Sequence, residues 1–348
     1  MSKNIIICCD GTDNKLTIGE NTNVIHLYSS LIFDANQVGY YSPGVGTIAP
    51  STFNYKLFKS YYVFKDLFSG TSLHSNVMDA YKYLMNTFEI GDKVYLFGFS
   101  RGAYTVRMLS GVIEMFGLLQ KGNSNHIKYI LEVYSRGDKM FETANSFKKK
   151  FSKAIDIEFI GVWDTVVSMG SLINWYKSYP YSRKLSIAKV VRHAVAIDER
   201  RKHFDYTAVS AEHKNLKEVF FAGVHSDVGG GYQEEGLSKI CFNWMIQEAI
   251  PHGIRFDMEK LREILVTNPA DINLEPHNSL SFLFKMADII PRPRFKKGET
   301  SNSWYFDFRC WIARKIPEGS LIHRSVVEKS IQGNYKPLNL PNVYKIEE

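Results

Sequence analysis

The sequence predicts an α/β fold in which a mostly parallel sheet carries helices on both faces, with helical and irregular insertions. Short apolar runs typical of buried strands alternate with segments in which apolar residues recur every three or four positions, as on one face of a helix. Polar residues follow these runs, at the sheet edge where open α/β folds bind their ligands. We therefore expect the functional site along the carboxyl ends of the strands.

Four apolar runs are the predicted strands, namely residues 5–9, 94–97, 155–163 and 218–224. Each run ends abruptly in a small or polar residue. The polar side chains expected at the strand ends are Asp10, Ser100, Asp164 and His225. Because parallel strands have their carboxyl ends at one edge of the sheet, these four residues are expected to face a common region.

A GxSxG element, Gly98 to Gly102, lies between the second predicted strand and a run of apolar residues at helical spacing. A nucleophile at such a turn has a strained backbone that exposes its hydroxyl, and the flanking glycines leave room for the turn. This context favours Ser100 as a nucleophile over a helix-capping serine in a glycine-rich turn. The amide of Arg101, at the positive end of the new helix, is the expected oxyanion donor.

A serine nucleophile needs a histidine base and a carboxylate that orients the histidine. His225 follows a predicted strand and precedes the glycine run 229–231, which allows a loop to fold back over the sheet. The acid is either Asp164, at a strand end, or Asp227, two residues after the histidine. The chain order serine, acid, histidine favours Asp164. Asp227 is expected to brace its own loop by accepting bonds from backbone amides.

The backbone of Gly11 and Thr12 is the expected second oxyanion donor, because an amide from another strand-end loop normally completes such a site. Asp10, Gly98, Gly102 and Asp227 are expected to support the arrangement. The Asp-Gly-Thr sequence at 10–12 also resembles the phosphatase loop of haloacid dehalogenases. That family needs a nucleophilic aspartate two residues earlier, where this chain has Cys8, so phosphoryl transfer of that type is excluded.

Seven motifs in order resemble the catalytic domain of the type VI secretion phospholipase effectors, an α/β-hydrolase family. They are residues 9–12, 23–24, 43–47, 98–104, 161–166, 198–201 and 223–232. The similarity runs from residue 5 to about 245, with weaker motifs at 322–326 and 335–337. It implies an α/β-hydrolase fold, esterase activity on glycerophospholipids, and a triad that maps by position onto Ser100, Asp164 and His225. It also leaves open a delivery or immunity protein as a partner, and an antibacterial role.

Two other classes of function remain as alternatives. One is a metal-dependent hydrolase whose ligands would be His225 and four carboxylates, Asp10, Asp13, Asp164 and Asp227. The other is a non-catalytic interaction module. The metal hypothesis gives Ser100 no role, and an intact set of serine, acid and histidine argues against the second. We therefore predict a serine hydrolase without metal or other cofactor.

The 348 residues contain no linker between self-sufficient halves, so we expect one domain over residues 1–348. The catalytic core is expected at about 1–250, with 251–348 packed on it as helices and irregular segments. No signal peptide or 18-residue apolar run is present in the sequence, which predicts synthesis as a soluble cytoplasmic protein and leaves export by a signal-free route open. Cys8 and Cys9 are neighbours, whereas Cys241 and Cys310 are isolated, so the four cysteines form neither a metal pair nor a disulfide framework.

The formal net charge of +7 favours anionic partners. The sequence has no dense basic stripe or zinc-finger spacing, so nucleic acid is not an expected partner. Two segments, 55–68 and 172–181, mix aromatic rings with lysines, as elements at a membrane interface do. The same pattern fits helices packed over the core. Together with the resemblance above, which implies glycerophospholipid esters, these segments make a phospholipid at a membrane surface the expected substrate.

Overall fold

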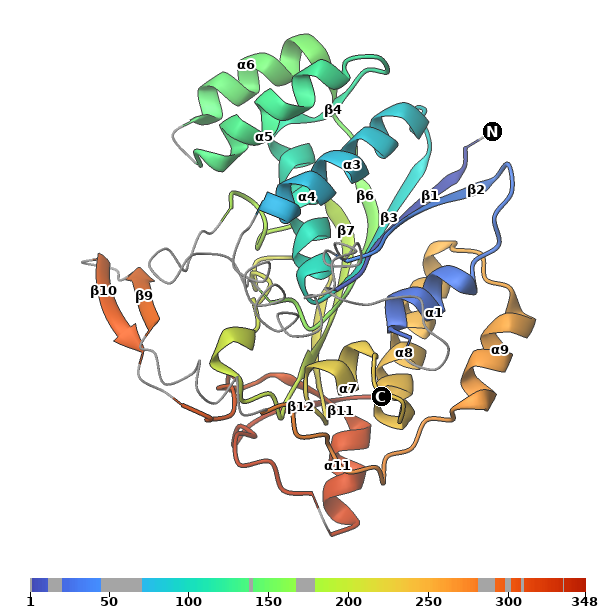
Figure 1. Cartoon of the computed structure of the whole chain (residues 1–348), viewed down its shortest axis with the longest axis vertical. Coiled ribbons are helices and arrows are strands. Elements are labelled where there is room, and N and C mark those ends of the chain that lie inside the picture. The colour runs from blue at the N-terminus through green and yellow to red at the C-terminus, as the bar shows by residue number, and fades with distance from the viewer. Residues whose placement is uncertain are drawn as a thin grey trace, which may run out of the picture.

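An eight-stranded sheet with the strand order β12-β11-β8-β7-β6-β3-β1-β2 forms the centre of the computed structural model (Figure 1). All neighbouring strands of this sheet pair in parallel. The structure describes residues 2–11, 21–44, 71–137, 140–166, 179–280, 292–297, 302–307, 310–333 and 335–348. Among these residues the predicted α/β class, with a parallel sheet and flanking helices, is confirmed.

The strands of the main sheet are β1 (Asn4–Cys9), β2 (Gln37–Ser42), β3 (Lys93–Phe99), β6 (Ile157–Trp163), β7 (Ala188–Ala196), β8 (Leu216–Phe221), β11 (Leu321–His323) and β12 (Lys345–Glu347). Two antiparallel pairs lie outside it, β4 (Leu118–Leu119) with β5 (Ser152–Lys153), and β9 (Arg292–Lys297) with β10 (Asn302–Asp307).

The helices are α1 (Asn23–Ser29), α3 (Thr71–Thr87), α4 (Arg101–Phe116), α5 (Ile127–Ser135), α6 (Phe141–Phe151), α7 (His225–Gly229), α8 (Gly236–Ala249), α9 (Met258–Thr267) and α11 (Arg324–Ile331). Figure 1 shows α3 to α6 on one face of the sheet and α1, α8 and α9 on the other. Short 3₁₀ turns span Ser124–His126, Lys202–Phe204 and Ile250–His252.

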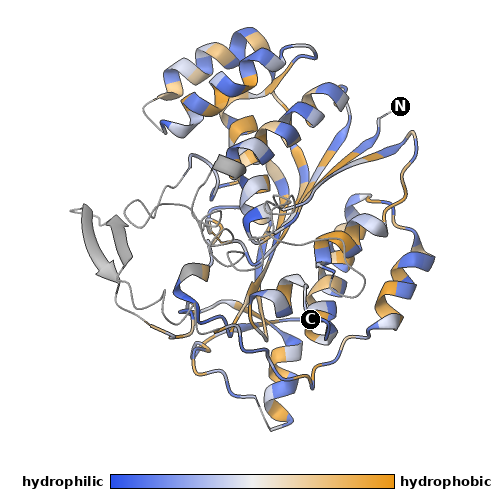
Figure 2. Ribbon diagram, in the orientation of Figure 1, coloured by the Kyte–Doolittle hydropathy of each residue, from blue (hydrophilic) through white to orange (hydrophobic). Residues whose placement is uncertain are grey.

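The alternation of side chains along the strands divides the core into two layers. On β1, Ile5 and Ile7 pack with α3, α4 and α5, whereas Ile6 and Cys8 pack with α1 and α8. Figure 2 shows the resulting pattern, with hydrophobic residues concentrated along the strands and on the helix faces beside them. Because both faces of the sheet are covered, its central strands consist largely of buried apolar residues.

The apolar runs of the sequence predicted β1, β3, β6 and β8 but not β2 or β7. In β7 the apolar run is interrupted by Arg192 and His193, which are nonetheless buried, because each is paired with a glutamate. One strand boundary was also wrong. The run expected to continue to residue 224 ends at Phe221, and His225 begins the short helix α7 instead of a loop.

Residues 251–348, expected as helices and irregular segments, contribute α9 and α11 and also two further strands of the main sheet. β11 pairs with β8, and β12 pairs with β11. Ile322 of β11 and Val326 of α11 are fully buried against Val195 and Phe220 of the central strands. Within the described part of the chain, no helix is long and apolar enough to cross a membrane.

We predict that Ile322→Ala lowers the free energy of unfolding by about 2–5 kcal/mol, because it opens a cavity between β11 and the central strands. The matched control is Ile346→Ala on the neighbouring strand β12, where the side chain is 51% exposed and the expected loss is below about 1 kcal/mol. Denaturant unfolding measures both. Equal small losses in the two variants would show that the C-terminal strands are not part of the cooperative core.

Candidate active site

Ser100 occupies the turn between β3 and α4 in a strained backbone conformation. Its φ of 58° and ψ of −121° lie outside the regions that residues with a Cβ atom normally adopt. Such strain persists only where the surroundings fix it. Here the Ser100 amide donates to the carbonyl oxygen of Trp163 at 3.0 Å, which ties the turn to the end of β6.

The two glycines of the motif are required by close backbone contacts. A Cβ atom on Gly98 would lie 2.6 Å from the carbonyl oxygen of Gly102 and 2.7 Å from Cα of Ala103. A Cβ atom on Gly102 would overlap the carbonyl of Cys9 and lie 2.5 Å from that of Asp10. Gly98 therefore permits the sharp entry into α4, and Gly102 allows the helix to approach the end of β1.

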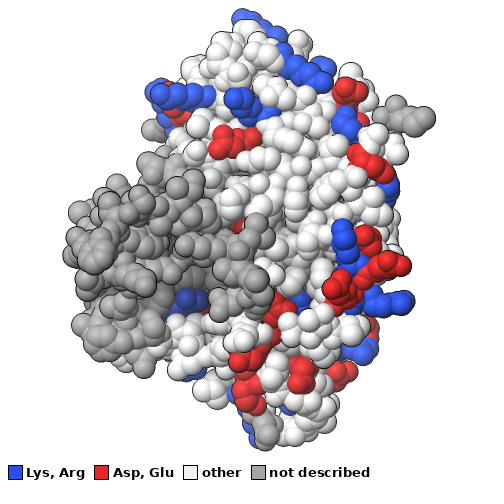
Figure 3. Space-filling model, turned by 45° about the vertical axis from the view of Figure 1, so that its right-hand side comes forward, with Lys and Arg blue, Asp and Glu red and all other residues white. Residues whose placement is uncertain are grey.

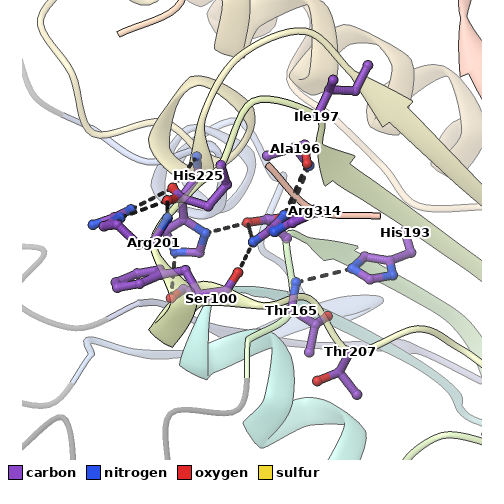
Figure 4. Close-up of polar contacts among 12 residues, drawn as sticks. Ser100, Thr165, His193, Ala196, Ile197, Arg201, Thr207, His225 and Arg314 are labelled. Carbon is purple, nitrogen blue, oxygen red and sulfur yellow. Dashed lines mark hydrogen bonds and ion pairs between the residues drawn. The ribbon is translucent and has the colours of Figure 1, made fainter. Parts of the chain in front are cut away.

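Ser100, His225 and Asp164 form one hydrogen-bonded chain (Figure 4). Nε2 of His225 lies 2.8 Å from Oγ of Ser100, and Nδ1 lies 2.5 Å from Oδ2 of Asp164. Ser100 is 7% exposed, His225 4% and Asp164 0%. The imidazole packs against the rings of Phe99 and Phe204, with centroids 4.6 and 4.9 Å away, which limits its rotation.

The sheet order accounts for this convergence. β3 and β6 are neighbours, so Ser100 and Asp164 leave adjacent carboxyl ends. His225 follows β8, which β7 separates from β6, and α7 carries its side chain back across the end of β7. The structure thus brings together the three residues that the sequence analysis selected.

Asp164 has a further partner that the sequence analysis missed. Arg314, from the C-terminal region, donates from Nη1 to Oδ1 at 2.5 Å and from Nη2 to Oδ2 at 2.9 Å. The amide of Ala196 on β7 donates to Oδ1 at 3.0 Å. No sequence signal marked Arg314, because it stands alone in a segment without a recognised motif, 150 residues after Asp164.

These contacts determine the charge states at the site. Complete burial alone would raise the pKa of Asp164, but the nearby Arg314 and His225 outweigh it and hold that pKa well below its ordinary value. Burial lowers the pKa of His225, and this exceeds the opposing effect of Asp164. A neutral imidazole beside an ionised carboxylate is the state in which Nε2 can accept a proton from Ser100.

A second pair that the sequence analysis left without a role lies beside His225. Glu199 is fully buried, accepts the His225 amide at 3.3 Å, and bonds Arg201 through both oxygens. Burial opposes ionisation, but the charge of Arg201 lowers the pKa of Glu199 to about 2. The Arg201 guanidinium lies 3.6 Å from the centroid of the Phe204 ring. This pair fixes the start of α7 and therefore the His225 backbone.

Asp227 bonds partners other than the His225 side chain. Its Oδ2 accepts the amides of Val224 and His277 at 2.9 and 3.0 Å, and its Oδ1 lies 2.6 Å from Nδ1 of His277. Its bonds therefore connect the turn before α7 to the segment around residue 277. That geometry fits the loop-bracing role expected from the sequence.

Asp10 organises the loop after β1. Its Oδ1 accepts the Gly11 amide at 2.7 Å, and its Oδ2 accepts the hydroxyls of Thr22 and Tyr41 at 2.7 and 2.9 Å. The Gly11 amide is thus engaged within its own loop in this structure, and Thr12 lies outside the described residues. Their oxyanion role stays a prediction. Arg101 is the first residue of α4, as expected.

The carboxylates named in the metal hypothesis have separate partners. Asp10 bonds Thr22 and Tyr41, whereas Asp227 bonds His277. Asp13 lies outside the described residues. Where the structure describes the chain, no three His, Cys, Asp or Glu side chains are grouped so as to hold a metal ion.

The chain is similar to several known proteins. Over 219 residues it is 36% identical to an uncharacterized protein of Saccharomyces cerevisiae, covering 58% of this chain and 32% of that protein. It therefore spans about a third of the length of this relative.

Two solved structures are each 20% identical to the chain. One is an uncharacterized protein from Pseudomonas aeruginosa, with a TM-score of 0.45 over 73% of this chain and 46% of the other. The second is the Tle1 effector bound to the VgrG spike from the type 6 secretion system. Its TM-score is 0.35, over 66% of this chain and 52% of the other.

Residues 3–248 match the family described as the type VI secretion system phospholipase effector Tle1-like catalytic domain. This span contains Ser100, Asp164 and His225 but ends before Arg314. It covers most of the chain and confirms the resemblance drawn from the seven motifs. The chain belongs to the family of Tle1-like phospholipase effector catalytic domains.

Proposed function

We propose that the protein is a serine-dependent phospholipase that cleaves acyl esters of glycerophospholipids. The observation that carries the proposal is the hydrogen-bonded chain from Ser100 through His225 to Asp164, within a family of phospholipase catalytic domains. In this proposal Ser100 is the nucleophile, His225 the general base and Asp164 the acid that orients the base.

In the first step Oγ of Ser100 attacks the acyl carbon while its proton passes to Nε2 of His225. The ionised Asp164 stabilises the imidazolium and holds the ring through Nδ1. The tetrahedral oxyanion is stabilised by the amide of Arg101, at the positive end of α4. His225 then donates its proton to the leaving alcohol, and an acyl group remains on Ser100.

Water completes the cycle. His225 accepts a proton from a water molecule, which attacks the acyl carbon. It then donates that proton to Oγ of Ser100 as the bond from Oγ to the acyl carbon breaks and the carboxylic acid leaves. Starting from a diacyl glycerophospholipid, the products are one free fatty acid and one lysophospholipid. Purified protein with defined phospholipids, followed by mass spectrometry of the products, tests this assignment. Release of diacylglycerol or phosphatidic acid would contradict acyl-ester cleavage.

The proposal includes contact with a membrane surface, for which the sequence offers the two segments that mix aromatic rings with lysines. Segment 55–68 lies outside the described residues, as does most of 172–181. At the described end of the second segment, Tyr179 is buried against Tyr134, and the Pro180 carbonyl accepts the Tyr134 hydroxyl at 2.6 Å. This end favours packing on the core over exposure at an interface. On the face drawn in Figure 3, Lys and Arg are scattered among Asp and Glu.

Export stays a proposal that rests on the family description, which names effectors of the type VI secretion system. A delivery protein and a neutralising immunity protein are the partners it would require. Affinity capture from cells that secrete the protein, compared with a secretion-deficient strain, tests for the first partner.

Ser100→Ala is expected to reduce phospholipid hydrolysis by about a millionfold, because removal of the nucleophile disables a triad that acts as a unit. The fold should be kept, since only one oxygen atom is lost. Turnover of purified variant and a thermal melt give the two readouts. A folded variant that keeps more than about a tenth of the original activity would exclude Ser100 as the nucleophile.

The two candidate acids are separated by Asp164→Asn and Asp227→Asn. The first should lower turnover by about four orders of magnitude, because an asparagine favours the wrong histidine tautomer. It should also reduce stability by about 3–5 kcal/mol, since Arg314 loses a buried charge partner.

Asp227→Asn is expected to lose about 1–2 kcal/mol of stability and less than tenfold in rate, because it weakens bonds to Val224 and His277 only. Melts and turnover, normalised to the folded fraction, compare the two variants. A large kinetic defect in Asp227→Asn with normal turnover in Asp164→Asn would reverse the assignment of the acid.

Hydrolysis of vesicles is expected to be faster with anionic than with neutral lipid, and to slow with added salt. The net charge of +7 attracts an anionic surface, and one basic residue near it contributes about 1 kcal/mol, or about a fivefold gain. Salt screens this attraction. Rates at low and high salt on both vesicle types provide the measurement. Equal rates on the two lipids at low salt would exclude charge from substrate capture.

A further inference from the structure

Arg314 lies outside the family match at residues 3–248, yet its guanidinium reaches the centre of the candidate site. The residue is 4% exposed. Besides both oxygens of Asp164, the guanidinium bonds the carbonyl oxygens of Ala196, at 3.1 Å, and Phe204. The side chain is therefore held on several sides. Its planar guanidinium bonds both oxygens of the carboxylate, the arrangement typical of a strong arginine–carboxylate pair. His225 bonds Oδ2 of this carboxylate and Arg314 bonds both of its oxygens, and Figure 4 shows the His225 and Arg314 side chains in the same site.

The charged groups around His225 form two acid–arginine pairs. Asp164 is paired with Arg314, and Glu199 with Arg201. Asp205 acts on Arg314 from the neighbouring turn, and Asp227, two residues after His225, is engaged with His277. The Cys241 thiol stays neutral, since burial, with smaller effects of Asp227 and Asp164, raises its pKa well above the ordinary value. Among the described residues, only Arg314 offsets the charge of Asp164 directly from the side opposite His225.

We propose that Arg314 is a positioning residue, which fixes both oxygens of Asp164 for the bond to His225 and keeps this buried carboxylate ionised. The inference rests on the proposed serine mechanism, which makes Asp164 the acid. A fully buried carboxylate without a cationic partner takes up a proton, because burial disfavours its charged form. A protonated Asp164 could not stabilise the imidazolium that forms when Ser100 loses its proton.

Loss of the Arg314 charge should shift the pH dependence of activity in one definite direction. The reactive state has an ionised Asp164 and a neutral His225, and adding one proton to this coupled pair abolishes it. Removal of a nearby positive charge raises the proton affinity of the pair, whichever residue takes the proton. The acidic limb of the activity profile must therefore move to higher pH. Lysine would keep the charge but cannot bond both carboxylate oxygens with a planar fork.

The test measures the rate of Ser100 labelling by a fluorophosphonate as a function of pH. In this reaction Oγ bonds to phosphorus, fluoride leaves, and His225 takes the hydroxyl proton, so no phospholipid is needed. Arg314→Gln is expected to raise the midpoint of the acidic limb by at least about one pH unit. Arg314→Lys should keep the midpoint within about half a unit and slow labelling about tenfold, the scale of one lost charge-assisted bond.

Arg192→Gln is the matched control. Arg192 is equally buried and bonds Glu248 together with the carbonyls of Val191 and Asn215. It lies on β7, four residues before Ala196 and about 13 Å along the strand from it. This variant should lose stability without a shift in the midpoint. A merely structural Arg314 would behave in the same way.

An unchanged midpoint in folded Arg314→Gln would overturn the inference. If that variant does not fold, Arg314→Lys decides. Labelling of Arg314→Lys at the original rate would exclude a positioning role, whereas a tenfold lower labelling rate at an unchanged midpoint would support it. Failure of the original protein to label at Ser100 is a different result. It would contradict the proposed serine mechanism itself.

Discussion

A carboxylate that has no access to solvent must find its hydrogen-bond donors inside the protein, and at Asp164 they come from three separate parts of the chain. The Ala196 amide belongs to β7, His225 begins α7, and Arg314 lies in the C-terminal region. An unpaired buried charge is very costly, so these elements must all be in place for the carboxylate to stay ionised. The geometry of the candidate site thus depends on the packing of sheet, helix and C-terminal segment around one side chain.

The same constraint extends to the turn that carries Ser100. The Ser100 amide bonds the carbonyl of Trp163, the residue immediately before Asp164. Both Ser100 and Asp164 have positive φ values, 58° and 38°, at the carboxyl ends of adjacent strands. Each such conformation costs about 1–3 kcal/mol and is maintained only by its surroundings. The register of β3 and β6 therefore sets the spacing between the serine and the acid, and α7 brings the histidine between them.

Local patterns were sufficient to predict the α/β class and the strand-end positions of Ser100 and Asp164, whereas His225 begins α7, beyond the end of β8 at Phe221. The β3 turn could be predicted because a nucleophile elbow needs glycines at fixed positions, and the structure shows close backbone contacts at both Gly98 and Gly102. Strand β7 could not be predicted, because Arg192 and His193 interrupt its apolar run. Both are buried because each pairs with a glutamate that is distant in the sequence. Arg314 could not be predicted for a related reason. Its role depends on a contact made by folding across 150 residues.

The central claim is that Ser100 attacks the ester carbon and carries the acyl group. Rapid acid quenching during turnover of a slowly deacylated ester, followed by peptide mass spectrometry, tests it most directly. The proposed mechanism predicts an acyl group on the peptide that contains Ser100, absent from protein denatured before mixing. Efficient turnover with no acylated peptide, or with the acyl group on another residue, would contradict it.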